Sequence, residues 1–535
     1  MRRSVLAFVA IIGATFVVAL SAGAVGPGGW NHLGVGASSS MPSLNGHVYA
    51  LNSQNPGVLY AGGDFTTAGG NSKAKRIARW NGSTWSALGN TPLTNGSVLA
   101  IAYKNGKVYA GGTFLNAGGN ADADFLAVWD GTSWAPFCNS TNSDPTFGGS
   151  VDALQIIGNT LYVGGAYQNG AGIDAADYLL ACDLTTGASS ATVDSDGDFE
   201  GAVYALTADS NGTLYAGGQF VNLDNIEAAD HVAAYDGTWH AMGTGPDNHA
   251  VDDFVRGLTA KGTDVYVGTD SLNVAGIAQA DHVARWNGTS WSAVGANTAG
   301  NDGWFSTTTF INALTTYGSL VVAAGSFQNA NGTANADEIA YFDGTKWRPI
   351  GSDGAGNGPL PGANSALSVV NGNLYASGNF TSAGGDALAR SVAAYSLRLP
   401  DSMIGGTRTG HFAGNGVYSS TGAGEARNLT IKRGKSETCY VKVQNDGLVA
   451  AAFTIKATGG ANGFKARYFH GNTNVTPAVD AGTYATGTIP ARGFVLLRVK
   501  VSVAHSSANS ATFVVAARST SGTPTDAVRA LVKAI

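Results

Sequence analysis

The sequence predicts an all-β chain, and three observations support this: a repeated phrase, regular turn signals within each repeat, and a final segment of alternating strands. The phrase first occurs at residues 59–65 (LYAGGDF) and last at residues 374–380 (LYASGNF). Its seven copies start at residues 59, 108, 161, 214, 265, 321 and 374, so successive copies lie 49 to 56 residues apart. That spacing is typical of one four-stranded propeller blade, which predicts a seven-bladed β-propeller over residues 25–398.

Each repeat has the pattern of four strands joined by short turns. In the second repeat, residues 98–104 alternate in hydrophobicity, Asn105-Gly106 turns the chain, and residues 108–114 form an apolar second strand. After a glycine-rich loop, residues 125–129 and 133–137 form the third and fourth strands around the Asp130-Gly131 turn. The paired glycines that close the second strand are expected where strands of neighbouring blades approach closely.

Tryptophan marks the start of the fourth strand, and it indicates how the ring closes. We expect these side chains to pack between neighbouring sheets; they are Trp85, Trp134, Trp239, Trp291 and Trp347. The seventh repeat ends without such a strand, whereas residues 30–34 (WNHLG) match residues 85–89 (WSALG). The N-terminal segment is therefore predicted to complete the last blade and remove an exposed sheet edge. The third repeat differs, because residues 184–192 replace its turn and tryptophan.

These motifs resemble the kelch family, in which a Gly-Gly pair closes the second strand and a tryptophan opens the last. They are more similar to bacterial secreted repeat proteins, and to fungal cortical polarity-marker domains, whose units read LYVGGxFTxAGG and ARWNGxxWxxLG. Residues 59–70 and 78–89 fit those two phrases. The resemblance covers roughly residues 30–395. It implies the propeller fold and does not specify a ligand.

Residues 399–535 lack the repeat and are predicted to form a second β domain. Alternating strands are expected at residues 428–431, 438–443, 452–457, 465–469, 495–503 and 511–517. Residues 439–447 and 452–455 resemble the strand, turn and strand of immunoglobulin-like accessory domains in bacterial exported proteins. The resemblance implies an immunoglobulin-like β-sandwich, and such domains usually space, stabilise or attach a neighbour.

The N-terminus and the charge indicate where the protein works. Arg2-Arg3, the apolar residues 5–20 and the small residues 22–24 form the pattern of a signal peptide over residues 1–24. A secreted protein, or one loosely associated with the cell surface, is therefore expected, without stable membrane insertion. The net charge of −6 and the pI near 5.8 argue against nucleic acid as a partner.

The three cysteines leave two interpretations open. Cys138 and Cys182 fall in outer strands of adjacent blades, so an exported protein could join them by a disulfide. The alternative is that all three, including Cys439, are small buried apolar residues, and the apolar neighbours of Cys138 and Cys182 favour it.

Aspartates supply the candidate metal and ligand residues. Asp194, Asp196 and Asp198 resemble the start of a Ca²⁺ loop, although Glu200 is too close to be its last ligand, so a solvated loop is the alternative. A second set precedes the third strand of five repeats and is expected either to fix a turn or to form a ligand-binding ring; it comprises Asp124, Asp177, Asp230, Asp281 and Asp337. Lys75 and Arg390 take that position in the first and seventh repeats. His231 and His282 recur at the following position, where a structural role is expected.

No zinc helix, nucleophile elbow, phosphate loop or Cys-x-x-Cys motif occurs in the sequence. The sequence therefore favours a non-catalytic scaffold that presents propeller loops to an extracellular glycan or protein ligand, with no cofactor beyond the Ca²⁺ just considered. The alternative is an extracellular carbohydrate-active enzyme, either a glycosidase or an oxidase similar to galactose oxidase, which also joins a kelch-type propeller to an immunoglobulin-like domain.

Overall fold

The protein is an all-β chain in a computed structural model that describes residues 29–138, 147–193, 200–296, 303–305, 309–458, 460–519 and 525–535. Its elements there are 39 strands, one α-helix, α1 (Thr476–Ala481), and five 3₁₀ helices: η1 (Ala117–Gly119), η2 (Gly170–Gly172), η3 (Leu223–Asn225), η4 (Val274–Gly276) and η5 (Ala330–Gly332). The predicted signal peptide and the predicted Ca²⁺ ligands Asp194, Asp196 and Asp198 lie outside the described residues. In this part of the chain, no helix is long and apolar enough to span a membrane.

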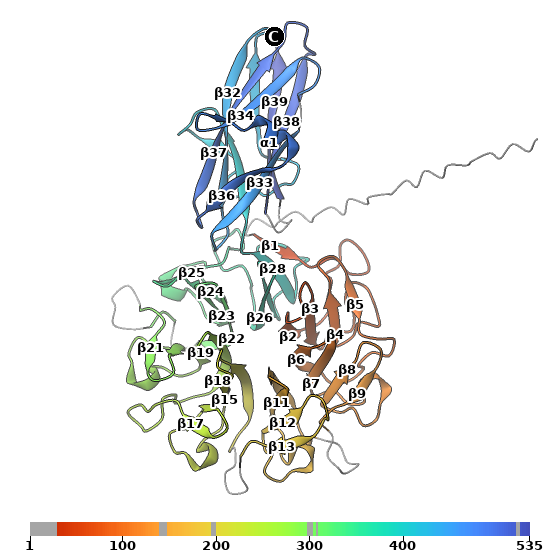
Figure 1. The fold of residues 1–535 in the computed structure, drawn as a ribbon, viewed down its shortest axis with the longest axis vertical. Helices are drawn as coiled ribbons and strands as arrows, with labels where there is room; N and C mark the ends of the chain where they lie inside the picture. The colour runs from red at the N-terminus through yellow and green to blue at the C-terminus, as the bar shows by residue number, and fades with distance from the viewer. Residues whose placement is uncertain are drawn as a thin grey trace, which may run out of the picture.

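Seven separate four-stranded antiparallel sheets stand around a common centre, a propeller-like arrangement with the first strands near the centre and the fourth strands at the rim (Figure 1). Sheet 1 contains β2 (Val48–Asn52), β3 (Leu59–Gly63), β4 (Ile77–Trp80) and β5 (Trp85–Ala87). Sheet 2 contains β6 (Val98–Lys104), β7 (Lys107–Gly112), β8 (Leu126–Trp129) and β9 (Trp134–Pro136). Sheet 3 contains β10 (Val151–Ile157), β11 (Thr160–Gly165), β12 (Leu179–Asp183) and β13 (Ser189–Ala191).

The remaining sheets repeat the same order. Sheet 4 contains β14 (Val203–Ala208), β15 (Leu214–Gly218), β16 (Val232–Tyr235) and β17 (Trp239–Ala241). Sheet 5 contains β18 (Val255–Lys261), β19 (Asp264–Thr269), β20 (Val283–Trp286) and β21 (Trp291–Ala293). Sheet 6 contains β22 (Phe310–Tyr317), β23 (Leu320–Ser326), β24 (Ile339–Phe342) and β25 (Trp347–Pro349). Sheet 7 contains β26 (Asn364–Val370), β27 (Asn373–Gly378), β28 (Val392–Ser396) and β1 (Trp30–His32).

Sheet 7 takes its outer strand from the N-terminal segment. Trp30 pairs with Tyr395 and His32 with Ala393, so β1 covers the edge of β28 by main-chain pairing. Trp30 is fully buried, and its ring lies 5.4 Å from that of Tyr395. The two ends of the ring are thereby joined within one sheet.

Glycine allows the inner strands to pack closely. A Cβ atom at Gly62 would lie 2.5 Å from Val98 of sheet 2, and one at Gly111 would lie 2.4 Å from Val151 of sheet 3. Real Cβ atoms are not found at such distances, so the Gly-Gly phrase sets the spacing between sheets.

Six tryptophans each join their own sheet to the preceding one through the indole N–H. Each donates to a backbone carbonyl that lies three residues after the start of the preceding sheet's fourth strand: Trp30 to Ile350 (2.8 Å), Trp85 to Leu33 (2.7 Å), Trp134 to Leu88 (3.3 Å), Trp239 to Thr192 (3.1 Å), Trp291 to Met242 and Trp347 to Val294 (2.9 Å). Because the acceptor is always at the same register, one residue type defines six of the seven junctions between sheets.

The seventh junction, between sheets 2 and 3, has a disulfide in place of the tryptophan. In the other sheets the tryptophan faces an aromatic residue of the third strand, as in the pair Trp80–Trp85, whereas in sheet 3 Cys182 faces Ser189. Cys182 is bonded to Cys138, which lies two residues after the end of the fourth strand of sheet 2, and the two Cα atoms are 5.6 Å apart. Of the two interpretations of the cysteines, the less favoured one is thus found at this pair. Cys439 is a free, buried cysteine.

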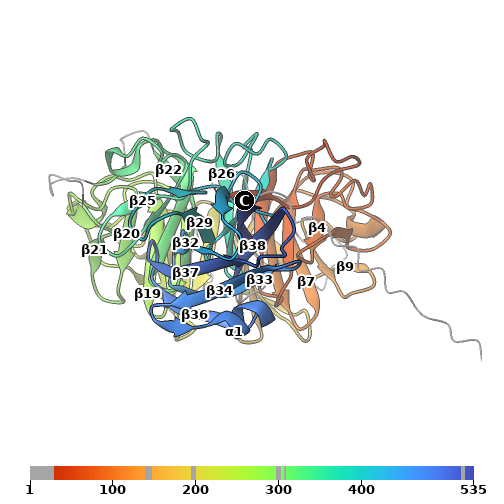
Figure 2. The ribbon, with the colours of Figure 1, turned by 90° about the horizontal axis from the view of Figure 1, so that it is seen from above.

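Two sheets form a second unit beside sheet 7 (Figures 1 and 2). One has the order β30-β29-β32-β37-β34-β35, with β29 (Pro400–Gly405), β30 (Phe412–Ala413), β32 (Ser436–Asn445), β34 (Phe464–His470), β35 (Thr473–Asn474) and β37 (Phe494–Val503). The other has the order β31-β39-β38-β33-β36, with β31 (Ala426–Ile431), β33 (Ala451–Thr458), β36 (Tyr484–Ile489), β38 (Ser510–Ser519) and β39 (Thr525–Ala534). Buried side chains of both sheets, among them Val441, Phe453 and Val499, form one core.

All six strands that were expected in this region are present, but β29, β30, β35, β36 and β39 were not anticipated. β29 lies where the sequence suggested a break, because Leu399-Pro400 ends the repeat pattern. All six of its residues are buried, so the strand has no alternation that a sequence pattern could reveal. β36 contains Gly487, which weakens its strand pattern.

Candidate functional site

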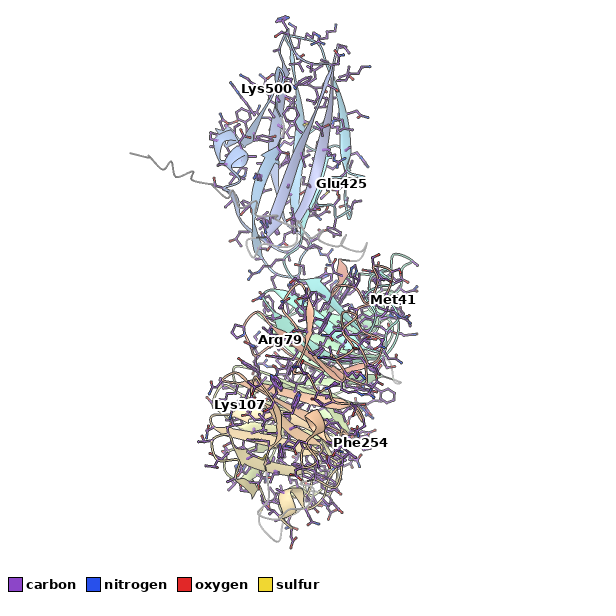
Figure 3. All side chains as sticks on the ribbon, turned by 90° about the vertical axis from the view of Figure 1, so that its right-hand side faces the viewer. Met41, Arg79, Lys107, Phe254, Glu425 and Lys500 are labelled. Atoms are coloured by element: carbon purple, nitrogen blue, oxygen red, sulfur yellow. A yellow bond between two sulfur atoms is a disulfide. The ribbon has the colours of Figure 1, made fainter. Side chains whose placement is uncertain are left out.

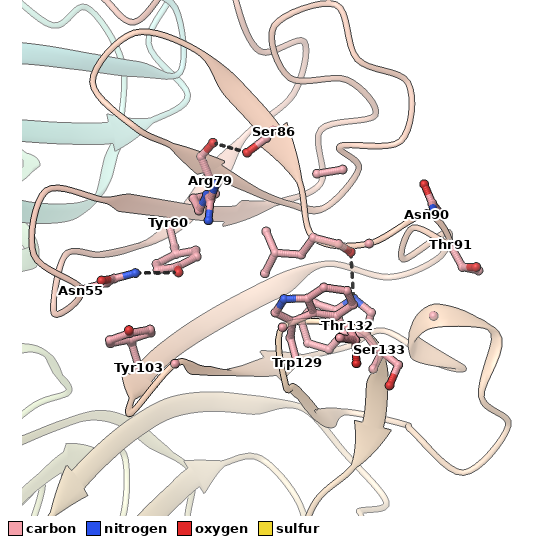
Figure 4. A pocket seen from close by; sticks show the side chains of 17 residues that line it. Asn55, Tyr60, Arg79, Ser86, Asn90, Thr91, Tyr103, Trp129, Thr132 and Ser133 are labelled. Atoms are coloured by element: carbon pink, nitrogen blue, oxygen red, sulfur yellow. Dashed lines mark hydrogen bonds between the residues drawn. The ribbon is translucent and has the colours of Figure 1, made fainter.

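The candidate site is a groove of about 790 Å³ between sheets 1 and 2 (Figure 4). Ligand sites in proteins typically have volumes of about 300–1,000 Å³. The side chains that line this groove come from the second, third and fourth strands of sheet 1 and from sheet 2, together with the connection between the two sheets. The groove therefore follows the boundary between two adjacent repeats.

One wall is built around Tyr60 in β3. Tyr103, the penultimate residue of β6, stacks on it with ring centroids 5.9 Å apart and an interplanar angle of 23°. The Asn55 side-chain amide donates to the Tyr60 hydroxyl at 3.0 Å, and Arg79 of β4 is the cross-strand partner of Tyr60. Burial raises the pKa of the Tyr60 phenol, so this hydroxyl stays protonated at neutral pH.

The opposite wall is formed by Trp129 and Trp134, whose rings lie 5.8 Å apart. Trp134 is held by its hydrogen bond to the carbonyl of Leu88, the junction contact between sheets 1 and 2. Trp129 is only partly buried and faces the groove. The rim carries hydroxyl and amide groups from Ser86, Asn90, Thr91, Thr132 and Ser133.

The aspartates predicted as ligand-binding candidates each fix a loop. One carboxylate oxygen accepts the backbone N–H of the residue eight positions earlier: Asp124 from Asn116 (2.6 Å), Asp177 from Asn169 (2.6 Å), Asp230 from Asn222 (2.7 Å), Asp281 from Asn273 (2.9 Å) and Asp337 from Asn329 (2.6 Å). This is the turn-fixing role that the sequence analysis weighed against ligand binding. A ligand-binding role stays a prediction.

Three of these aspartates also contact the connection that leaves their own sheet. Asp281 accepts the N–H of Gly303 at 3.1 Å and Asp337 that of Gly358 at 3.0 Å, while Asp230 lies 3.4 Å from His249. The loops between second and third strands therefore share a face with the connections between sheets. The aspartates do not line the groove.

A backbone feature that was not anticipated occurs directly after the five aspartates and after Lys75 and Arg390, which replace the aspartate in the first and seventh repeats. Seven non-glycine residues there have φ between 57° and 63°: Arg76, Phe125, Tyr178, His231, His282, Glu338 and Ser391. Their backbones bridge the loop to the second strand, as when the N–H of Gly218 donates to the carbonyl of His231. The repetition of His231 and His282 thus reflects a shared turn, which six different residue types occupy in the seven repeats, and not a catalytic pair.

A second group, also not anticipated, lies in the half of the second unit nearer the ring, where Figure 3 labels Glu425. Asp401, Glu425 and Asp526 are buried, and both carboxyl oxygens of Glu425 lack a hydrogen-bond partner in the described structure. Burial, followed by the influence of nearby carboxylates, raises the pKa of Asp401 to about 8 and that of Glu425 to about 9. Burial raises the pKa of Asp526 to about 7.

The described part of the chain offers little for metal chemistry. It contains no group of three or more His, Cys, Asp or Glu side chains arranged to hold a metal ion. Cys138 and Cys182 are bonded to each other, and Cys439 is buried in the core of the second unit. The groove can therefore act through stacking, hydrogen bonding and the charge of Arg79.

No family model matches the chain, and no curated protein matches it. Three solved structures that are similar to parts of it cover 18–25% of this chain. A FixG-related protein from Vibrio parahaemolyticus is 10% identical over 18% of this chain and 78% of that chain, with a TM-score of 0.14. A family 123 glycoside hydrolase from Clostridium perfringens is 6% identical over 25% of this chain and 27% of that chain, with a TM-score of 0.18. The CooA pilin subunit from enterotoxigenic Escherichia coli is 7% identical over 21% and 94%, with a TM-score of 0.16.

Proposed function

We propose that this protein is a secreted, non-catalytic binding protein that holds an extracellular glycan. In this proposal the seven sheets are a kelch-like seven-bladed β-propeller, closed by the N-terminal strand. The second unit is an immunoglobulin-like sandwich that spaces or attaches the propeller. The signal-peptide pattern at residues 1–24 supports secretion.

The groove between sheets 1 and 2 is the observation that carries the proposal. Sugar rings present an apolar face and a periphery of hydroxyl groups. The apolar face of a sugar can stack on flat aromatic rings, and the groove supplies those of Tyr60, Tyr103 and Trp129. Amide and hydroxyl side chains such as Asn90 and Thr132 can both donate and accept hydrogen bonds, as sugar hydroxyls require.

The proposal is tested by screening the full secreted chain against a glycan array and then titrating the best ligand. Tyr103→Ala removes one half-buried ring of the groove, and we expect it to weaken binding by about 10-fold or more. Tyr162→Ala, a ring at the boundary of sheets 3 and 4, is the matched control and should leave binding unchanged.

Two results would contradict the proposal. If Tyr103→Ala leaves glycan binding intact, the groove is not the binding site. Turnover of the bound glycan, measured as new reducing ends or as oxidised product, would favour the alternative of a carbohydrate-active enzyme.

A further inference from the structure

The groove contains one formal charge, the guanidinium of Arg79. The seventeen residues that line it include no Asp, Glu, Lys or other Arg. In the described residues, the ion pairs formed by arginine are those of Arg256, Arg285 and Arg348. Figure 4 shows the Arg79 side chain beside Tyr60, at the aromatic wall. A positive charge thus faces the groove without a carboxylate partner in the described structure.

Arg285 of sheet 5 occupies the same structural position as Arg79, but its charge is neutralised by an ion pair. Arg285 is the cross-strand partner of Tyr266, as Arg79 is of Tyr60. The guanidinium of Arg285 lies 2.9 Å from Asp264, the residue that begins β19. In sheet 1 the corresponding residue, directly before Leu59, is Val58. The sequence therefore keeps the arginine in sheet 1 and omits its acidic partner.

We propose that the groove binds a saccharide that carries an anionic group, a carboxylate or a sulfate, and that Arg79 receives that group. This inference rests on the proposed function and names the class of glycan. A planar guanidinium presents paired N–H donors whose geometry matches a carboxylate or a sulfate. The stacked rings of Tyr60 and Tyr103 stand next to this charge, so an acidic sugar can stack and pair at once.

The groove fits a saccharide better than an acidic peptide. Recognition of acidic peptides usually relies on clusters of arginine, and only one cation lines this groove. Its other polar groups are neutral hydroxyls and amides, including Asn55, Ser86 and Thr91. These suit a ligand with many hydroxyl groups and few charges.

The test is isothermal titration of the full secreted chain with four probes. They are a galacturonic acid hexamer, a sulfated galactan oligosaccharide, a neutral galactan hexamer of the same length, and an oligoglutamate. We expect at least one anionic saccharide to bind about 10-fold or more tightly than the neutral hexamer, and Arg79→Gln to abolish that difference. The two anionic saccharides distinguish carboxylate from sulfate as the preferred group.

Arg285→Gln is the matched control, because it removes the same charge from the equivalent position outside the groove. We expect it to leave the preference for anionic saccharides unchanged. Arg79→Lys keeps the charge but loses the paired donors, and we expect an intermediate affinity. Raising the salt concentration should weaken binding of the anionic probes to the unaltered protein and leave the neutral probe unaffected, which tests the charge contact without any substitution.

The outcomes separate this inference from the proposed function. Equal binding of neutral and anionic saccharides, or a folded Arg79→Gln variant that retains the preference, overturns the role of Arg79 and leaves glycan binding in place. Tighter binding of oligoglutamate than of either anionic saccharide overturns the assignment to a saccharide. Failure of every saccharide to bind overturns both proposals.

Discussion

The disulfide between Cys138 and Cys182 replaces the tryptophan contact at one junction, so removing it should weaken the ring at a known place. The perturbation is the double variant Cys138→Ala and Cys182→Ala, which introduces no buried polar atom. Both cysteines are fully buried, and 44 positions separate them in the sequence. Without the bond, the indole donor that holds the other six junctions is absent here, because Ser189 occupies its position.

The magnitude follows from the length of the closed loop. A cross-link that spans 44 residues lowers the entropy of the unfolded chain, and this stabilises the folded state by about 4 kcal/mol. The unfolding entropy of a ring of roughly 370 residues is about 0.8 kcal/mol per degree, so the melting temperature should fall by about 5 °C.

Differential scanning calorimetry in oxidising buffer measures this shift. Cys439→Ala is the control, because it removes a buried sulfur that forms no bond, and we expect it to cost about 1 kcal/mol or less. Hydrogen exchange should also increase in β10 and β13 more than in sheets held by tryptophan. A double variant that melts within about 1 °C of the unaltered protein would refute the idea that the disulfide holds this junction.

Three further predictions concern closure, pH and domain independence. Trp30→Ala should lower the free energy of unfolding by about 3–5 kcal/mol, because it empties a fully buried site in sheet 7, where the N-terminal strand closes the ring. An unchanged calorimetric melting temperature would contradict this role of the N-terminal strand. The raised pKa values of Asp401, Glu425 and Asp526 mean that the folded state binds protons more tightly than the unfolded state, so stability should fall as pH rises from about 4 to about 9. Glu425→Gln should therefore raise the melting temperature at pH 9 relative to the unaltered protein but not at pH 4, and equal shifts at both pH values would contradict the assignment. A fragment of residues 399–535 should show a β-type circular dichroism spectrum and melt cooperatively, whereas a disordered fragment would mean that its core depends on the ring.

The repeat made most of the ring predictable from sequence. The Gly-Gly phrase and the Asn-Gly and Asp-Gly turns are local signals, so the strands of each sheet could be assigned from them. Trp30 could be assigned to the last sheet because its surroundings match those of Trp85. In the third repeat, the missing tryptophan was visible, but its replacement by the Cys138–Cys182 bond depends on contacts between sheets that a linear pattern does not encode.

The groove was harder to predict because its residues look like ordinary members of the repeat. Tyr60 and Trp129 occupy standard strand positions, and Arg79 differs from Arg285 only through a residue on the neighbouring strand. A comparison of the repeats by cross-strand partners, setting Val58 against Asp264, could have found the unpaired charge. The buried carboxyl groups of the second unit could not have been found in this way, because Asp401, Glu425 and Asp526 lie on segments far apart in sequence.

The central claim is that this protein binds a glycan in the groove between sheets 1 and 2. The most direct test is hydrogen exchange with and without a bound anionic oligosaccharide. The account predicts slower exchange at residues 53–60, 79–91, 103–106 and 129–134, with the oligosaccharide recovered intact. Protection confined to the loops of Asp124, Asp177, Asp230, Asp281 and Asp337, or cleavage of the oligosaccharide, would contradict it.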